Sequence, residues 1–253
     1  MCAYILKTDV AAGDRVYERP AKRDAISVLV NGSPRALRPA PVVAPQEQPL
    51  GGTPKRILDI VGALVALVLL APLMIVVAAL IRLILGGPVF YAQTRVGFGG
   101  KTFVCYKFRT MVENAEEVLE EYLRVNPAAA AEWNETRKLR NDPRVTCLGN
   151  VLRKSSIDEL PQLFNILRGE MSLVGPRPVQ PDELSRYGRH ARAYLQARPG
   201  LTGMWQTNGR SSVDYDGRVA RDRYYARYWS LWLDLLLLVK TIPAVLDYKN
   251  SAF

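Results

Sequence analysis

Cysteine and histidine are scarce in this chain of 253 residues. The three cysteines, Cys2, Cys105 and Cys147, are far apart and odd in number. This pattern predicts neither a disulfide framework nor a zinc site, and it fits a reducing compartment. The only histidine, His190, lies in a basic polar run, which favours a surface position over a catalytic triad. Acid–base chemistry must therefore depend mainly on carboxylates.

Motifs of nucleic-acid-binding proteins are also missing. The chain contains no C2H2 spacing, no RNA-binding aromatic signature and no basic zipper. No apolar run follows its first basic residues, as a secretory signal would require. A net charge of +10 and a pI of about 9.6 nevertheless indicate an anionic partner. Acidic lipid or a phosphorylated substrate is therefore favoured over nucleic acid.

Residues 1–54 form an expected N-terminal extension. The stretch Arg35–Pro49 is rich in proline and alanine and is followed by Gly51 and Gly52. This composition is typical of an extended, mobile linker. A brief strand is expected at Ala25–Val30.

The longest apolar run, Ile57–Ile81, is interrupted by one charged residue, Asp59. A straight helix of this length would measure about 38 Å at ~1.5 Å per residue, against a hydrocarbon core of roughly 30 Å, so a spanning helix is the default interpretation. Pro72 in the middle would bend the helix, and basic residues at both ends give no preferred orientation. These are Lys55, Arg56 and Arg82. A spanning helix, a bent re-entrant helix and a buried helix of a soluble protein remain alternatives on these residues.

Two strands are expected at Val89–Gln93 and Lys101–Thr110, joined through Gly97–Gly100 as a hairpin. The glycine-rich connection lacks the Walker A pattern, so a simple turn is favoured over a phosphate-binding loop. The hairpin carries three basic residues: Arg95, Lys107 and Arg109. They fit a solvated face, a diphosphate site or contacts with lipid head groups.

Two adjacent carboxylates, Asp158 and Glu159, follow Ser155 and Ser156 and precede Pro161. Serine before acids, an early proline and then apolar periodicity predict a helix start. In the first helical turn, unpaired N–H groups and the helix dipole favour anions. We therefore expect both carboxylates to stay ionised, which suits a nucleophile or a metal ligand. Both serine–acid spacings also match the capping box, which leaves plain helix capping as the alternative.

Two arginines accompany this acid pair, Asp158 and Glu159. Arg153 precedes it, and Arg177 lies in a Gly-Pro-Arg-Pro turn that ends at Pro178. Arginines beside carboxylates can hold phosphate oxygens while a carboxylate or a bound cation acts on phosphorus. Their presence favours a phosphate-handling site over capping alone.

Four further helices are expected: Glu113–Arg124, Ala128–Arg140, Pro181–Ala197 and Asp214–Arg227. The glycine-broken stretch Arg198–Gln206 is either an ordinary turn or a ligand loop. A second apolar run, Tyr228–Leu246, begins with aromatic residues and is expected to lie along the membrane surface, with a soluble core helix as the alternative. Asp234 inside this run is costly unless it is paired, and we expect an arginine near the active site as its partner.

The runs Asp158–Gln162 and Ser172–Pro178 closely resemble motifs of the bacterial sugar transferase family. These are the monotopic polyprenyl-phosphate phosphoglycosyl transferases that start exopolysaccharide, O-antigen and glycan assembly. The similarity extends from about Lys55 to Leu246 and includes the matching stretches QTRVG, KFRTM and RPGLTG-x-WQ. The run WQTNGRSSVDYD is most similar to exopolysaccharide-initiating members that use UDP-glucose or UDP-galactose, and N-acetylated sugars remain open.

The resemblance implies an α+β, mostly helical fold with a membrane-embedded re-entrant helix, a small β-hairpin and interfacial amphipathic helices. It divides the chain into a flexible extension at 1–54, a re-entrant membrane helix at 55–85 and a cytoplasmic catalytic domain at 86–253. The membrane bend would fall at Ala71 and Pro72. The family has a Ser-Pro pair here, so this chain lacks the serine hydroxyl that could bond a freed carbonyl.

The resemblance also implies a reaction, the transfer of a sugar-1-phosphate from a UDP-sugar to polyprenyl (undecaprenyl) phosphate with release of UMP. Asp158 would attack the β-phosphorus and form an aspartyl phospho-sugar, which the lipid phosphate then attacks. Magnesium is the implied cofactor, with Asp158 as its ligand, and Glu159 would assist the second step or the metal. The implied substrate-binding residues are Arg95, Lys107, Arg153, Arg177, Pro178 and Asp234.

The expected partners are a UDP-sugar, polyprenyl phosphate and membrane lipid, at the cytoplasmic face of the bacterial inner membrane, and nucleic acid is not expected. Two other classes remain. One is a membrane-anchored scaffold in which the acid pair is only a capping box, and the other is a basic, membrane-associated nucleic-acid binder. The apolar run and the Gly-Pro-Arg-Pro turn count against both. The sugar, homo-oligomerisation and the role of residues 1–54 stay open.

Overall fold

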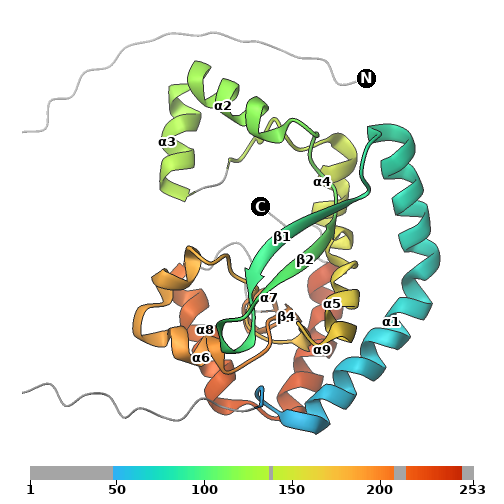
Figure 1. Cartoon of the computed structure of the whole chain (residues 1–253), viewed down its shortest axis with the longest axis vertical. Coiled ribbons are helices and arrows are strands. Elements are labelled where there is room, and N and C mark those ends of the chain that lie inside the picture. Colours follow the sequence, from blue (N-terminus) through green and yellow to red (C-terminus); the bar gives the residue numbers. More distant parts are fainter. Residues whose placement is uncertain (1–47, 137–138, 208–214, 247–253) are drawn as a thin grey trace, which may run out of the picture. The chain divides into compact units, whose positions relative to one another are not determined.

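The computed structural model describes residues 48–136, 139–207 and 215–246 (Figure 1). The strand expected at Ala25–Val30 therefore lies outside the described residues. Within these ranges the chain is mostly helical, with two small two-stranded sheets and one long apolar helix. This content agrees with the expected α+β class.

Helix α1 runs from Gly52 to Leu80 and continues as a π-helical segment at Ile81–Leu85. Among the described residues it is the one helix long and apolar enough to cross a membrane. Its 34 residues correspond to about 50 Å. The helix is continuous through Ala71 and Pro72, and the bend and re-entrant course expected there remain predictions.

One stripe of α1 faces the rest of the protein. Lys55, Asp59, Ala63, Met74 and Val77 are buried along it, at spacings close to whole helical turns that keep side chains on one face. Many large apolar side chains elsewhere on α1 are exposed. The helix thus has a protein-facing stripe and a broad apolar surface along its length.

Strands β1 (Phe90–Val96) and β2 (Thr102–Phe108) pair in antiparallel fashion through a 3-10 turn at Phe98–Gly100. The predicted hairpin is therefore confirmed, and β1 continues beyond Gln93, where the sequence pattern placed its end. The glycines of the turn supply the positive φ angles that such a tight connection requires.

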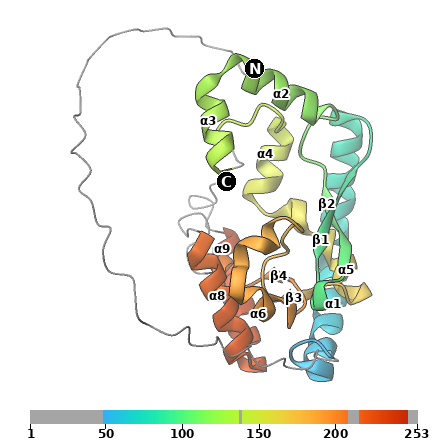
Figure 2. The ribbon, with the colours of Figure 1, turned by 60° about the vertical axis from the view of Figure 1, so that its left-hand side comes forward.

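Helix α5 (Gln162–Arg168) lies beside the hairpin, as both views of the molecule show (Figure 2). Asn165 of α5 is fully buried. Its side-chain Nδ2 donates to the Val104 carbonyl at 2.7 Å, and its side-chain Oδ1 accepts from the Tyr106 N–H at 3.1 Å. A buried amide that bonds two groups of one strand fixes that strand to the helix. The hairpin is therefore held in place from the helix that follows the acid pair.

The other helices are α2 (Ala115–Val125), α3 (Pro127–Thr136), α4 (Cys147–Lys154), α6 (Ala191–Leu195), α7 (Met204–Thr207), α8 (Tyr215–Tyr228) and α9 (Leu231–Leu246). Three of them, α2, α3 and α8, confirm the helices expected at Glu113–Arg124, Ala128–Arg140 and Asp214–Arg227. Helix α4 was not predicted. Its N-cap is Thr146, whose hydroxyl accepts from the Gly149 N–H at 2.9 Å.

The prediction of a single helix at Pro181–Ala197 is wrong. That stretch divides into a 3-10 segment at Glu183–His190 and the short helix α6. Inside the 3-10 segment, Gly188 has a φ of 49° and interrupts the helical geometry. Glycine adopts this backbone freely, so the chain can turn there without steric cost.

A second, parallel sheet pairs β3 (Ser172–Val174) with β4 (Gly200–Thr202). Strand β4 lies in the stretch Arg198–Gln206, for which the sequence allowed either an ordinary turn or a ligand loop. Here the backbones approach closely, because a Cβ built on Gly200 or Gly203 would overlap backbone atoms of Gly175. The loops after β3 and β4 are therefore held against each other by residues without side chains.

Among the described residues, three hydrophobic clusters join these elements. The first packs α1, the hairpin, α5, β3 and α9 around side chains that include Ile166, Met171 and Tyr225. The second packs the C-terminal half of α1 against Phe108 and Leu152. The third lies among β1, the 3-10 segment, α6 and α8. All three border the segments that carry the acid pair and its arginines.

Asp234 of α9 is fully buried and pairs with Lys55 of α1. The Lys55 Nζ lies 2.6 Å from Asp234 Oδ2, and the Tyr225 hydroxyl and Trp229 Nε1 donate to the same carboxylate at 2.7 and 3.0 Å. The prediction of an arginine as the partner of Asp234 is therefore wrong. The first turns of α1 and α9 meet, so the lysine that precedes the apolar run supplies the positive charge.

We expect Lys55→Met to destabilise the protein by about 3–5 kcal/mol, because it leaves the Asp234 carboxylate buried without its positive partner. Thermal unfolding in detergent, followed by circular dichroism, measures this as a lower midpoint. The double variant Lys55→Met/Asp234→Leu should recover most of the loss, since no buried charge remains. Lys101→Met at an exposed position of the hairpin turn is the control. A midpoint unchanged by Lys55→Met would contradict the structural role of the pair.

Candidate active site

The acid pair lies in a 3-10 turn, Ile157–Glu159, between α4 and α5. Ser156 has a left-handed backbone with a φ of 57°, which turns the chain after α4. Asp158 and Glu159 therefore lie in the first turn of a helical segment that follows the serines, as predicted. That segment is a short 3-10 turn that precedes α5, and not the start of α5 itself.

Neither predicted capping box forms. The Ser155 hydroxyl donates back to the carbonyls of Val151 and Leu152, at 2.8 and 3.1 Å. Within the described residues, Ser156 makes no side-chain cap hydrogen bond. Helix capping therefore does not account for two adjacent carboxylates at this turn.

Lys107 of β2 contacts both members of the acid pair. Its Nζ lies 2.6 Å from Glu159 Oε1 and 3.7 Å from Asp158 Oδ2. Asp158 is buried, whereas Glu159 and Lys107 keep part of their side chains exposed. The pairing of β2 with β1 and its bonds to α5 hold this amine in position beside the carboxylates.

The two acids have opposite pKa shifts. Burial raises the pKa of Asp158 to about 6; the charge of Glu159 adds to the rise, and Lys107 and Arg153 oppose it. Burial also tends to raise the pKa of Glu159. The ion pair and hydrogen bond with Lys107 outweigh this effect, so the pKa of Glu159 falls below its usual value. Desolvation, which the sequence pattern did not reveal, therefore sets the pKa of Asp158. A pKa of about 6 still leaves this acid largely ionised at neutral pH, as expected from the sequence.

Both predicted arginines reach the acid pair. Arg153, in the last turn of α4, donates from Nε to Thr110 Oγ1 at 2.9 Å, and its charge attracts Asp158. Arg177 lies close enough to act on the charges of Glu159 and its lysine partner. Three cations thus surround two carboxylates, which leaves excess positive charge for a phosphorylated ligand.

Arg95 joins the site through the loop that carries Arg177. Only 8% of Arg95 is exposed. Its Nη1 donates to the Pro178 carbonyl at 3.2 Å and lies 3.5 Å from Glu183 Oε2, while Nη2 donates to Gln93 Oε1 at 2.5 Å. These contacts anchor the Gly-Pro-Arg-Pro loop to the hairpin, and the expected contact of Arg95 and Pro178 with substrate stays a prediction.

Asp222 of α8 holds the same loop and was not singled out from the sequence. Its carboxylate accepts from the Tyr187 hydroxyl at 2.8 Å and from the backbone N–H of Arg177. Burial raises the pKa of Asp222 to about 7. The residue lies in a helix dense with charges, where no local signal separates the one buried carboxylate from its solvated neighbours.

Asp59 of α1 is a second positioning residue whose role the sequence did not identify. It accepts from the Ser172 hydroxyl at 2.8 Å and from the Leu173 N–H at 2.9 Å. Both donors belong to β3, which leads directly into the loop of Arg177. The sequence did contain a signal for this role: Asp59 is the one carboxylate in the long apolar run, where a buried charge needs a partner.

Three predicted residues lie outside this cluster. Asp234 belongs to the separate buried group with Lys55. Ala71 and Pro72 lie inside α1. The structure therefore brings Asp158, Glu159 and their basic neighbours together but leaves these three apart.

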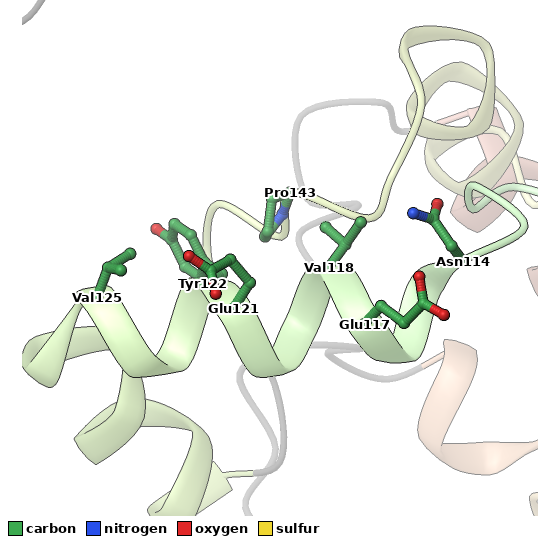
Figure 3. Close-up of a pocket in the computed structure, with 7 residues that line it drawn as sticks. All are labelled: Asn114, Glu117, Val118, Glu121, Tyr122, Val125 and Pro143. Atoms are coloured by element: carbon green, nitrogen blue, oxygen red, sulfur yellow. The ribbon is translucent and has the colours of Figure 1, made fainter.

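A cavity of about 410 Å³ lies along α2 (Figure 3), and neither member of the acid pair lines it. Its lining consists of Asn114, Glu117, Val118, Glu121, Tyr122, Val125 and Pro143. Two carboxylates and apolar groups without a basic side chain do not attract an anionic substrate. The cavity therefore does not serve the chemistry that the acid pair indicates.

The acid pair offers two carboxylates to a metal ion. In the described ranges, no group of three His, Cys, Asp or Glu side chains is placed to hold one. Magnesium is usually bound by one or two carboxylates together with substrate phosphates and water. The donor set therefore suits magnesium that is shared with a phosphorylated substrate, and it does not suit a metal held by protein groups alone.

A profile of the family described as bacterial sugar transferase matches residues 51–248. The exopolysaccharide production protein ExoY of Rhizobium meliloti (strain 1021) is 55% identical over 216 residues, which cover 84% of this chain and 96% of the relative. The undecaprenyl-phosphate galactose phosphotransferase of Salmonella typhimurium is 52% identical over 192 residues, 76% of this chain and 40% of the relative. The UDP-glucose:undecaprenyl-phosphate glucose-1-phosphate transferase of Caulobacter vibrioides is 42% identical over 205 residues, 78% of this chain and 71% of the relative.

We expect Lys107→Met to raise the pKa of both acids, Asp158 above about 6 and Glu159 above its lowered value, because the amine favours the ionised form of each. Carboxyl ¹³C chemical shifts of labelled protein, titrated from pH 4 to 8 in magnesium-free buffer, measure both values. Lys101→Met is the matched control and should change neither. Titration of the acid pair at unchanged pH in Lys107→Met would contradict the observed ion pairs.

Proposed function

The chain belongs to the bacterial sugar transferase family, and from this premise we propose that it transfers a hexose-1-phosphate from a UDP-sugar to polyprenyl (undecaprenyl) phosphate and releases UMP. The observation that carries the proposal is the buried Asp158 beside Glu159, faced by Lys107, Arg153 and Arg177. Both substrates are phosphate esters, which excess positive charge attracts. The names of the Salmonella and Caulobacter relatives describe reactions of this class.

In the first step, a carboxylate oxygen of Asp158 attacks the β-phosphorus of the UDP-sugar. A bond forms between that oxygen and phosphorus, the bond from phosphorus to the bridging oxygen breaks, and UMP leaves with the electron pair. In the second step, a phosphate oxygen of the lipid attacks the same phosphorus and releases Asp158 as a carboxylate. A pKa of about 6 suits this role, because a more basic carboxylate is a stronger nucleophile and is still largely ionised at neutral pH.

The surrounding cations stabilise charge on the transferred phosphoryl group. Phosphoryl transfer depends mainly on positioning and on electrostatic stabilisation of the phosphoryl oxygens, which we assign to Lys107, Arg153 and Arg177. The Lys107 amine lies 2.6 Å from Glu159 and 3.7 Å from Asp158, so Glu159 is its closer partner. This arrangement places a positive charge next to the nucleophile without a direct hydrogen bond to it. We further assign Glu159 to assistance of the second step.

Asp158, with Glu159 beside it, would hold magnesium together with oxygens of the donor diphosphate. When bound there, the ion would shield the diphosphate charge so that an anionic nucleophile can approach. Lys107 and Arg177 act in the same direction, because they also place positive charge beside the acid pair.

The apolar surfaces support a membrane location for this reaction. Exposed apolar residues lie along α1, and α9 exposes a stripe that contains Trp232, Leu235, Val239 and Ile242. The isoprenoid tail of the acceptor would stay in lipid while its phosphate meets the acid pair at the surface. We infer a re-entrant course for α1, bent at Ala71 and Pro72, with the catalytic domain on the cytoplasmic face of the inner membrane.

Asp158→Asn should lower UMP release about a thousand-fold or more, because an amide cannot form the acyl phosphate intermediate. Purified protein in nanodiscs would receive magnesium, polyprenyl phosphate and a panel of UDP-sugars, with UDP-glucose and UDP-galactose as the favoured donors. UMP release and the appearance of labelled lipid are measured together.

Asp182→Asn, at an exposed position, is the matched control and should retain the wild-type rate. No UMP release across the panel, from folded and lipid-bound wild-type protein, would exclude the proposed transfer for these donors. That result would favour a membrane-anchored scaffold instead.

A further inference from the structure

Trp205 of α7 has two arginines beside its indole ring. The guanidinium carbons of Arg177 and Arg218 lie 5.1 and 5.0 Å from the ring centroid. Arg177 belongs to the loop beside the acid pair, whereas Arg218 belongs to α8. Arg177 therefore stands between the acid pair and a second group of side chains, which we define as the Trp205 cluster: Trp205, Gln206 and Arg218.

Each member of the Trp205 cluster has a buried polar atom without a partner. In the part of the chain that the structure describes, no hydrogen bond reaches Trp205 Nε1, Arg218 Nε or Gln206 Oε1. Buried polar atoms are nearly always paired, since an unpaired one loses its hydration without compensation. Two donors and one acceptor without partners thus lie on adjacent residues of α7 and on the arginine of α8 that stacks on Trp205. Unpaired groups of this kind are available to a ligand that is bound during function.

The charge of this region identifies the kind of ligand. Among the described residues, neither Arg177 nor Arg218 forms an ion pair with a carboxylate, and their like charges repel each other. An anion that binds near both guanidinium groups relieves this repulsion. A neutral ligand would leave it in place.

We propose that the Trp205 cluster, together with Arg177, forms the subsite for the UMP portion of the donor. This inference rests on the proposed function. Asp158 must meet the β-phosphorus, so the donor extends from there as the UMP portion on one side and as the hexose on the other. Only the UMP portion is charged, which suits the two arginines. Its uracil edge also presents an acceptor, a donor and an acceptor, the complement of the unpaired set in the Trp205 cluster.

The test measures UMP binding in detergent by isothermal titration calorimetry, without lipid acceptor. Trp205→Phe keeps an aromatic ring and removes the N–H, and Arg218→Lys keeps the charge and removes Nε. Each should weaken UMP binding about tenfold and leave glucose-1-phosphate binding unchanged. The exposed residues Trp232 and Arg223 provide the matched controls Trp232→Phe and Arg223→Lys, which should bind UMP as wild type does.

Steady-state kinetics provide the second readout. In both Trp205→Phe and Arg218→Lys, the KM for the UDP-sugar should rise about tenfold while the KM for polyprenyl phosphate stays unchanged. A role in folding alone would instead lower the thermal midpoint and the active fraction, without separating the two KM values.

Three outcomes would overturn the inference. Wild-type UMP affinity in both variants would place the nucleotide elsewhere, while transfer by the wild-type protein would leave the proposed function intact. Weakened glucose-1-phosphate binding with unchanged UMP binding would assign the Trp205 cluster to the hexose. Wild-type protein that neither binds UMP nor releases it from UDP-sugars would remove the proposed function together with the subsite.

Discussion

Three glycines bring the two loops of the site into backbone contact, and the positions of the functional side chains depend on it. Gly175 follows β3 and precedes Arg177, whereas Gly200 and Gly203 lie in and just after β4, ahead of Trp205. A side chain on Gly200 or Gly203 would overlap the backbone of Gly175 and separate the loops. Because each strand is only three residues long, this contact, more than the extent of the sheet, fixes where Arg177 and Trp205 lie.

Two buried carboxylates of this protein differ in a way that separates structure from chemistry. Asp234 is enclosed by protein partners, with Lys55 at 2.6 Å and two further donors on the same group. Asp158 is also buried, and this burial raises its pKa to about 6. The Lys107 amine lies 3.7 Å from Asp158 and bonds Glu159 instead. A buried carboxylate with all its partners holds segments of the fold together, whereas an incompletely paired one retains the capacity to react.

Local sequence patterns predicted local features correctly. Two strand-like runs around a glycine-rich connection identified the hairpin, and the apolar run identified α1. The acid pair with its arginines identified the segment around which basic groups gather. Prediction failed where distant packing decides the outcome. Strands of three residues are too short to show a periodic pattern in the sequence. The predicted capping boxes do not form, because Ser156 adopts a left-handed backbone. The sequence indicated that Asp234 needs a positive partner, but not that Lys55, 179 residues away, would supply it.

Helix α1 links a broad apolar surface to both segments of the candidate site. Its C-terminal half packs in one cluster with Ile157 and Leu160, which flank the acid pair in the sequence. Asp59, on the same buried stripe, binds Ser172 at the start of the strand that leads to Arg177. The acid pair and the Gly-Pro-Arg-Pro loop are therefore attached to one helix whose outer surface is apolar. In the proposed reaction, the depth of α1 in lipid sets the height of both segments, so an acceptor phosphate at the level of the head groups meets them together.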